Sequence, residues 1–335
     1  MPEMSRQPSK TAFYVVLRLG GSAAVLLLLF HFVSFAQVWQ ALGSLPAPVW
    51  LAVLGAYFCV HLAGVQKYRL MLNGAGAELN FTQAARCYFT GLFGVLLLPS
   101  VVGGDVLKAG LALRLCRSKA GVLLGSLLDR LLDLTALVTL AATGAALAPG
   151  ELHPADRRGF LFVLAAIAAA AVAAALVLTL LPARRFPFRV RRWLARLRLA
   201  WRSVAKRPLR VLCALGLGFF AQLGFLSLTV LLAAACGLHL PYRVWLFAWP
   251  IAKLSAFVPI SQAGIGVREA ALAGLLVPFG AAAGVVVGAG LAWETVVISA
   301  ALIGGLISLI LGRCPAGQAR EMDPEPSEPL RVRTP

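Results

Sequence analysis

Two short stretches of this sequence, 99–108 and 259–269, interrupt long apolar runs. In each of them proline comes first, then glycine, then charged residues. Proline lacks a backbone donor and glycine permits a bend, so each stretch predicts a helix that stops and restarts, with Asp105 capping the first restart. The free N–H groups and positive dipole end of a restarted helix bind anions, and Lys108 and Arg268 add positive charge there. The alternative is that the glycines serve close helix packing. We predict a site for an anionic group such as phosphate, formed by Gly103, Gly104, Asp105, Lys108, Gly264, Gly266, Arg268 and Glu269.

A second set of charged residues also falls within apolar runs. At the centre of a membrane a charge costs about 2.5–3.5 kcal/mol on insertion scales, so it tends to have a partner or a function. These residues either pair with one another to fix helix packing or line a polar pathway, and Arg130 is spaced to pair with Asp133. The set is Asp129, Arg130, Asp133, Lys253 and Glu294.

The sequence offers little for other chemistry. The six cysteines form no CxxC pair, the four histidines form no HExxH motif, and no Walker A sequence is present. We therefore expect no metal, no cofactor, no catalytic residue and no direct use of ATP.

The composition indicates an integral membrane protein. Of 335 residues, 60% are hydrophobic, and the mean hydropathy is +0.85, whereas soluble domains are about 45–50% apolar. Unwound backbone survives in a bilayer only where it is packed in protein or lines a wet cavity. The two interrupted stretches are therefore the most informative part of the chain.

Apolar length and basic residues together predict the topology, because Lys and Arg near span ends mark the cytoplasmic side. Lys67 and Arg69 mark one such end, and the segment around 31–48 is expected to be an external loop. The first run could instead be a secretory signal, but it is long for one. Full spans are predicted at 13–35, 49–72, 120–147, 160–181, 211–236 and 281–311.

Between these spans we expect two hairpins of opposite orientation, one turning at 99–104 and one over 244–279. The predicted fold class is an all-α polytopic membrane protein with about six full transmembrane helices, two re-entrant or broken-helix hairpins and a possible inverted repeat. The alternative is that each hairpin crosses, giving up to ten passes. A cytoplasmic tail (1–12), a single membrane domain (13–312) and a disordered cytoplasmic tail (313–335) complete the expected organisation, with both termini cytoplasmic.

A basic segment at 186–206 has apolar residues at helical spacing and arginines on the other faces. It predicts an amphipathic helix on the membrane surface, and much of the net charge of +18 lies here. We expect its partners to be anionic lipid head groups rather than nucleic acid.

The motifs LPSVVGGDVLKA, LLDRLLDL and PISQAGIGVREAAL resemble the membrane domain of lysylphosphatidylglycerol synthases and related stand-alone flippase-like proteins, over most of residues 10–312. The resemblance implies a protein of the cell membrane, the inner membrane in bacteria, that moves a polar phospho- or glycolipid between leaflets. In that family aminoacyl transfer belongs to a soluble domain that follows the membrane domain. This chain carries only a short polar tail there, so we expect that it is not an enzyme.

Two alternatives to transport remain open at this point. The first is a non-transporting, lipid-binding scaffold subunit of a lipid biosynthetic pathway, with an enzyme of that pathway or a second copy of the chain as partner. The second is a membrane-embedded lipid transferase that uses Asp105 or Glu269 as a base.

Overall fold

The structure is a computed structural model, and it describes residues 34–97, 101–147, 188–256 and 264–313, with the isolated positions 165 and 169. Within these residues the chain forms ten α-helices and no strand, which confirms the all-α fold. The predicted spans at 13–35 and 160–181, the turn at 99–100 and the tail after Arg313 fall wholly or almost wholly outside the described residues.

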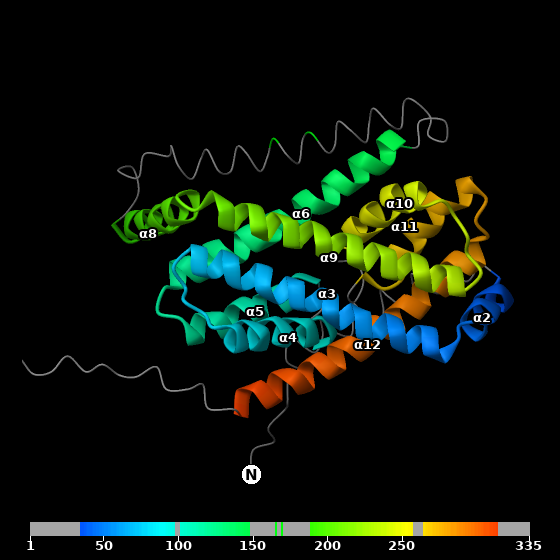
Figure 1. Ribbon diagram of the computed structural model, residues 1–335, viewed down its shortest axis with the longest axis horizontal. Coiled ribbons are helices and arrows are strands. Elements are labelled where there is room, and N and C mark those ends of the chain that lie inside the picture. The colour runs from blue at the N-terminus through cyan, green and yellow to red at the C-terminus, as the bar shows by residue number, and fades with distance from the viewer. Residues whose placement is uncertain are drawn as a thin grey trace, which may run out of the picture.

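Long apolar helices form the frame of the molecule (Figure 1). Three described helices are long and apolar enough to cross a membrane: α3 (Ala47–Gly74), α9 (Pro208–Ala235) and α12 (Ala283–Arg313). At 1.5 Å per residue, α3 is about 42 Å long, more than the ~30 Å of a hydrocarbon core. Helix α6 (Lys119–Leu147) has similar length and carries the charged motif LLDRLLDL.

A first helical hairpin consists of α4 (Phe81–Leu97) and α5 (Val101–Leu115). These helices are about 25 and 22 Å long, shorter than the hydrocarbon core. The sequence prediction that the chain bends at Gly103 and Gly104 is wrong, because α5 begins at Val101 and already contains both. A Cβ atom on Gly104 would lie 2.5 Å from the carbonyl oxygen of Gly91, so this glycine lets the two helices touch.

A second hairpin consists of α10 (Tyr242–Ser255) and α11 (Val267–Leu276), followed by a 3-10 turn, η3 (Val277–Phe279). Its helices are shorter still, about 21 and 15 Å. Gly264 and Gly266 both have φ near +85°, at 85° and 86°, a region that favours glycine. The predicted bend before a restarted helix is therefore present here.

The two hairpins enter the bundle from opposite ends (Figure 1). The first lies at the end that also holds α8 (Phe188–Ala205), and the second lies at the end that holds α2 (Phe35–Gly43). The expectation that residues 31–48 form a loop is wrong for α2, whose buried Val38 and Ala41 lie against α12. The inner ends of the helices of both hairpins lie in the middle of the bundle, where the polar residues collect.

Candidate functional site

The inner ends of the hairpin helices line a central cavity of about 240 Å³. The first hairpin contributes Val95, and the second contributes Lys253, Ala256 and Arg268. The first hairpin also contributes Tyr88 and Leu92, and the second also contributes Trp249. The remaining walls come from the middle of α3, α6, α9 and α12, with the aromatic side chains of Tyr57, Phe225 and Trp293. A smaller cavity of about 140 Å³ adjoins it and is lined by Gly104, Asp105 and Lys108.

Ten charged side chains line these two cavities or pair with a residue that does. Five are basic and five are acidic: Lys67, Lys108, Arg130, Lys253, Arg268, Asp105, Asp129, Asp133, Glu269 and Glu294. Nearly all of the residues predicted from sequence are thus brought together, and Lys67 is added to them. Gly264 and Gly266 shape the turn before α11, and Gly103 lies in the first turn of α5.

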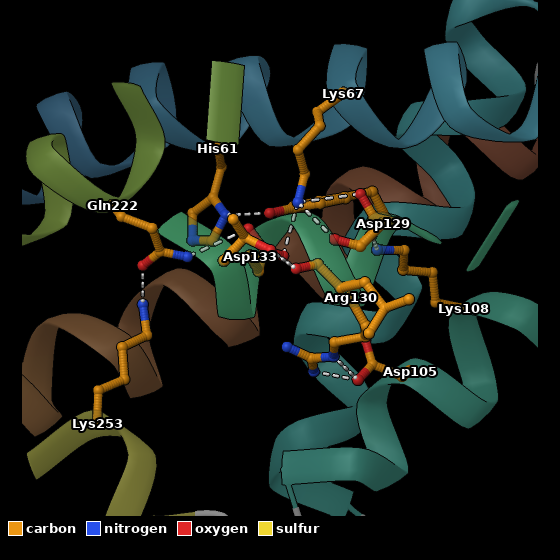
Figure 2. A network of polar contacts seen from close by, with 12 residues as sticks. His61, Lys67, Asp105, Lys108, Asp129, Arg130, Asp133, Gln222 and Lys253 are labelled. Carbon is orange, nitrogen blue, oxygen red and sulfur yellow. Dashed lines mark hydrogen bonds and ion pairs between the residues drawn. The ribbon is translucent and has the colours of Figure 1, made fainter. Parts of the chain in front are cut away.

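Two lysines and two aspartates form a buried ion-pair network between α3, α5 and α6 (Figure 2). Lys67 Nζ lies 3.1 Å from Asp129 Oδ1 and 2.6 Å from Asp133 Oδ2. Lys108 Nζ lies 2.7 Å from the other oxygen of Asp129. The use of Lys67 as a marker of a cytoplasmic end is therefore wrong, because its side chain is 3% exposed and serves this network.

The predicted free charge at Lys108 is therefore paired within the protein. Its ammonium group lies 3.9 Å from the centre of the Tyr68 ring and 4.8 Å from that of Tyr88, in addition to its contact with Asp129. Because a carboxylate and two ring faces already surround it, Lys108 holds α5 against α6.

Arg130 joins the first hairpin to α6 through an ion pair with Asp105 (Figure 2). The predicted role of Asp105 as a helix cap is wrong, because it is the fifth residue of α5 and its carboxylate accepts from the guanidinium. Asp133, which the sequence places near Arg130, accepts from Lys67 and from the amide of Gln222. The first hairpin is thus fixed to α6 by two ion pairs, one through Arg130 and one through Lys108.

The second hairpin has its own ion-pair cluster. The Arg268 guanidinium lies 2.9 Å from Glu269 Oε1 and 2.9 Å from Glu294 Oε1 of α12. The fully buried Glu269 also accepts a hydrogen bond of 2.7 Å from the backbone N–H of Gly266, which closes the first turn of α11. The backbone N–H of Gly266 is therefore taken by a carboxylate of the chain itself.

Lys253 differs from the other cations of the site (Figure 2). Its ammonium group donates to Gln222 Oε1 at 2.8 Å and lies 4.6 and 4.9 Å from the ring centres of Trp249 and Phe225. Among the described residues, no carboxylate lies within ion-pair distance of it. The cavity therefore contains a cation whose contacts are an amide and aromatic faces.

Several residues of the cavity were not singled out from the sequence. His61 lines both cavities, its Nδ1 lies 3.1 Å from the Tyr88 hydroxyl, and its Nε2 is buried without a partner in the described part of the chain. His61 and Lys67 are polar residues within the apolar run of α3, and Gly64 lies between them at a spacing of three. This pattern was the available signal for a polar site on α3. For Gln222 the signal was an amide in the middle of an apolar span.

The chain was compared with known proteins. The sequence model of a protein family described as "Lysylphosphatidylglycerol synthase TM region" matches residues 15–305, which include every residue of both cavities. A comparison with curated proteins gives no match.

Proposed function

We propose that this membrane protein is a flippase-like transporter of a polar phospho- or glycolipid. The premise is that the chain belongs to the family of the lysylphosphatidylglycerol synthase transmembrane region. The observation that carries the proposal is the charged cavity between the inner ends of the helices of two opposed hairpins. Charge in the middle of a membrane bundle is costly and marks pathways for polar groups. The family match covers a transmembrane region, and the proposal assigns no enzymatic step to the chain.

The proposal includes six full spans, two re-entrant hairpins related by an inverted repeat, and cytoplasmic termini. The four hairpin helices are each shorter than a hydrocarbon core, which supports re-entry rather than crossing. In inverted-repeat transporters the substrate site lies near the midplane, where interrupted helices from both halves meet. The central cavity lies between helices of the two hairpins, which supports this assignment.

Within the cavity, Lys253 is the residue we assign to the lipid phosphate. Exchanging an amide acceptor for a phosphate oxygen gives the ammonium a charged partner, and the bond strengthens because one acceptor is now ionised. Lys108 and Arg268 already have carboxylate partners, so their role is to hold α5 and α11 in place. A cavity of about 240 Å³ is smaller than the ~300–1,000 Å³ of typical ligand pockets, so it admits a head group while the tails stay in lipid.

The non-transporting scaffold also has an observation in its favour. Nine of the ten charged side chains around the cavities are paired with one another within the described residues, as a static bundle requires. A scaffold would bind lipid without moving it, so the two functions differ in a translocation assay and not in a binding assay.

The test is head-group translocation in proteoliposomes that contain a fluorescent phospholipid, with a membrane-impermeant quencher added outside. Lys253→Met should lower the translocation rate at least tenfold, and Lys253→Arg should retain most of it, because the charge is kept. Folded yield should not fall in either variant, since no carboxylate loses its partner. Lys206→Met, at an exposed position beyond α8, is the matched control.

Two outcomes contradict the proposal. If Lys253→Met translocates lipid as fast as the unsubstituted chain, Lys253 does not hold the head group. If the unsubstituted chain binds the lipid but does not translocate it, the scaffold function replaces transport.

A further inference from the structure

A second polar site lies at one end of the bundle, where α8 packs over the turns that follow α3 and α5. It consists of two adjoining recesses of about 610 and 630 Å³ that share Gly76 and Ser203. The central cavity shares no lining residue with either recess. We call the pair the α8 recess.

The walls of the α8 recess are strongly basic. One part is lined by Arg117, Lys119 and Arg196, and the other by Arg69, Arg207 and Arg210. The single acidic residue of the lining is Glu78. Among the described residues, none of the six basic side chains forms an ion pair, in contrast to the paired cations of the central cavity. Their charge is therefore available to an anion from outside the chain.

The chain holds this recess in a fixed shape. Ser203 Oγ donates to the carbonyl oxygen of Gly74 at 2.9 Å, which ties α8 to the end of α3. The side-chain amide of Asn73 donates to Leu79 O at 2.8 Å and accepts from Leu79 N–H at 2.7 Å, which locks the turn before α4. Buried Ala200 and Val204 of α8 pack in one apolar cluster with residues of the α3 end and of α6. A preformed recess of this kind loses little entropy when it binds a ligand.

Exposed leucines in the recess and close to it in the chain indicate the kind of anion. Leu199 lines the recess and is 71% exposed. Leu209 and Leu212, which flank the lining residue Arg210 at the start of α9, are 71% and 63% exposed. A soluble phosphate compound has no acyl chain to cover such an apolar surface. A phospholipid satisfies both surfaces, because its phosphate contacts the basic wall while its acyl chains cover the leucines.

From these observations we propose that the α8 recess binds the phosphate head group of an anionic membrane phospholipid. The inference is independent of the central cavity and holds whether the chain transports lipid or scaffolds an enzyme. The sequence alone predicts a general attraction between the basic helix α8 and anionic lipid. The proposed site is more specific, because it is built from α3, the α5–α6 turn and α8.

Photo-crosslinking in proteoliposomes tests the site directly. The full chain carries Leu199→benzoylphenylalanine, and the vesicles contain phosphatidylglycerol and phosphatidylcholine in equal amounts. We expect at least a fivefold preference for phosphatidylglycerol at this position and none at Leu231→benzoylphenylalanine, a position on α9 that is 51% exposed and lines neither part of the recess.

A charge variant and a matched control then identify the residues responsible. Arg117→Gln, Lys119→Gln and Arg196→Gln together should remove the preference. The control triple variant removes the same number of charges at exposed positions of α5 and α8 outside the recess, and it should keep the preference for phosphatidylglycerol. Its substitutions are Arg114→Gln, Arg192→Gln and Arg202→Gln. All six residues are exposed, so folding should survive, and the retained melting temperature checks it.

Three results overturn the proposal. Equal loss of preference in the two triple variants would mean that α8 attracts lipid by net charge alone. Loss of the lipid crosslink when millimolar glycerol 3-phosphate is present during irradiation would assign the recess to a soluble phosphate compound. Absence of any head-group preference at position 199 would show that no anionic lipid binds there.

Discussion

The ion-pair network of α3, α5 and α6 gives a quantitative prediction about Lys108. Lys108→Met keeps the aliphatic stem and removes the ammonium, so Lys67 alone must balance the two carboxylates of Asp129 and Asp133. The side chain of Asp129 is 4% exposed, and that of Lys67 is 3% exposed. Breaking a buried pair in this way costs about 3–5 kcal/mol, because it leaves an uncompensated buried charge.

A second substitution should recover part of that loss. In the double variant Lys108→Met/Asp129→Asn, the remaining Lys67 and Asp133 are a balanced pair whose charged atoms lie 2.6 Å apart. The residual cost is then that of lost hydrogen bonds, about 1–2 kcal/mol. The double variant should therefore be more stable than Lys108→Met by roughly 2 kcal/mol.

The free energy of unfolding in mixed micelles, followed by circular dichroism, measures this difference. The control is Lys108→Met/Glu294→Gln, which restores the same net charge at a residue that shares no partner with Lys108, so the effects of its two changes should add. The reasoning fails if Lys108→Met leaves stability within about 0.5 kcal/mol of the unsubstituted chain, or if Glu294→Gln rescues it as well as Asp129→Asn does.

Two further predictions concern the first hairpin and the topology. Gly104→Ala should destabilise the protein by about 1–3 kcal/mol, because its Cβ would meet the Gly91 carbonyl oxygen, whereas Gly110→Ala, with nothing within 4 Å, should be neutral or slightly stabilising in the same unfolding assay. In a cysteine-free background, Gly43→Cys should react with an impermeant thiol reagent in intact cells and Glu78→Cys only after permeabilisation; the reverse pattern would invert the proposed topology.

The sequence predicted well those features that depend on local residue types. Apolar length located the spans that became α3, α9 and α12, and proline and glycine located both hairpins. The positive φ of Gly264 and Gly266 follows from the freedom of glycine and the need to turn before α11. The same reasoning failed at Gly104, since a glycine that permits a bend and one that permits close contact look alike in sequence.

The partners of the buried charges could not be predicted from spacing. Asp129 and Asp133 were recognisable on one face of a helix, but their cations, Lys67 and Lys108, lie 62 and 21 residues from Asp129. Lys67 resembled a residue at the membrane surface because it lies near the end of an apolar run. Its burial depends on how α3 packs against α6, which no local pattern encodes.

The equality of five basic and five acidic side chains around the two cavities has a consequence for the membrane potential. A rearrangement that shifts these residues together carries no net protein charge through the electric field. Each elementary charge that crosses 100 mV is worth about 2.3 kcal/mol. If the chain transports lipid as proposed, the voltage dependence of transport would therefore report the summed charge of the lipid and of any ion that moves with it, and an electrically silent cycle would mean that this sum is zero.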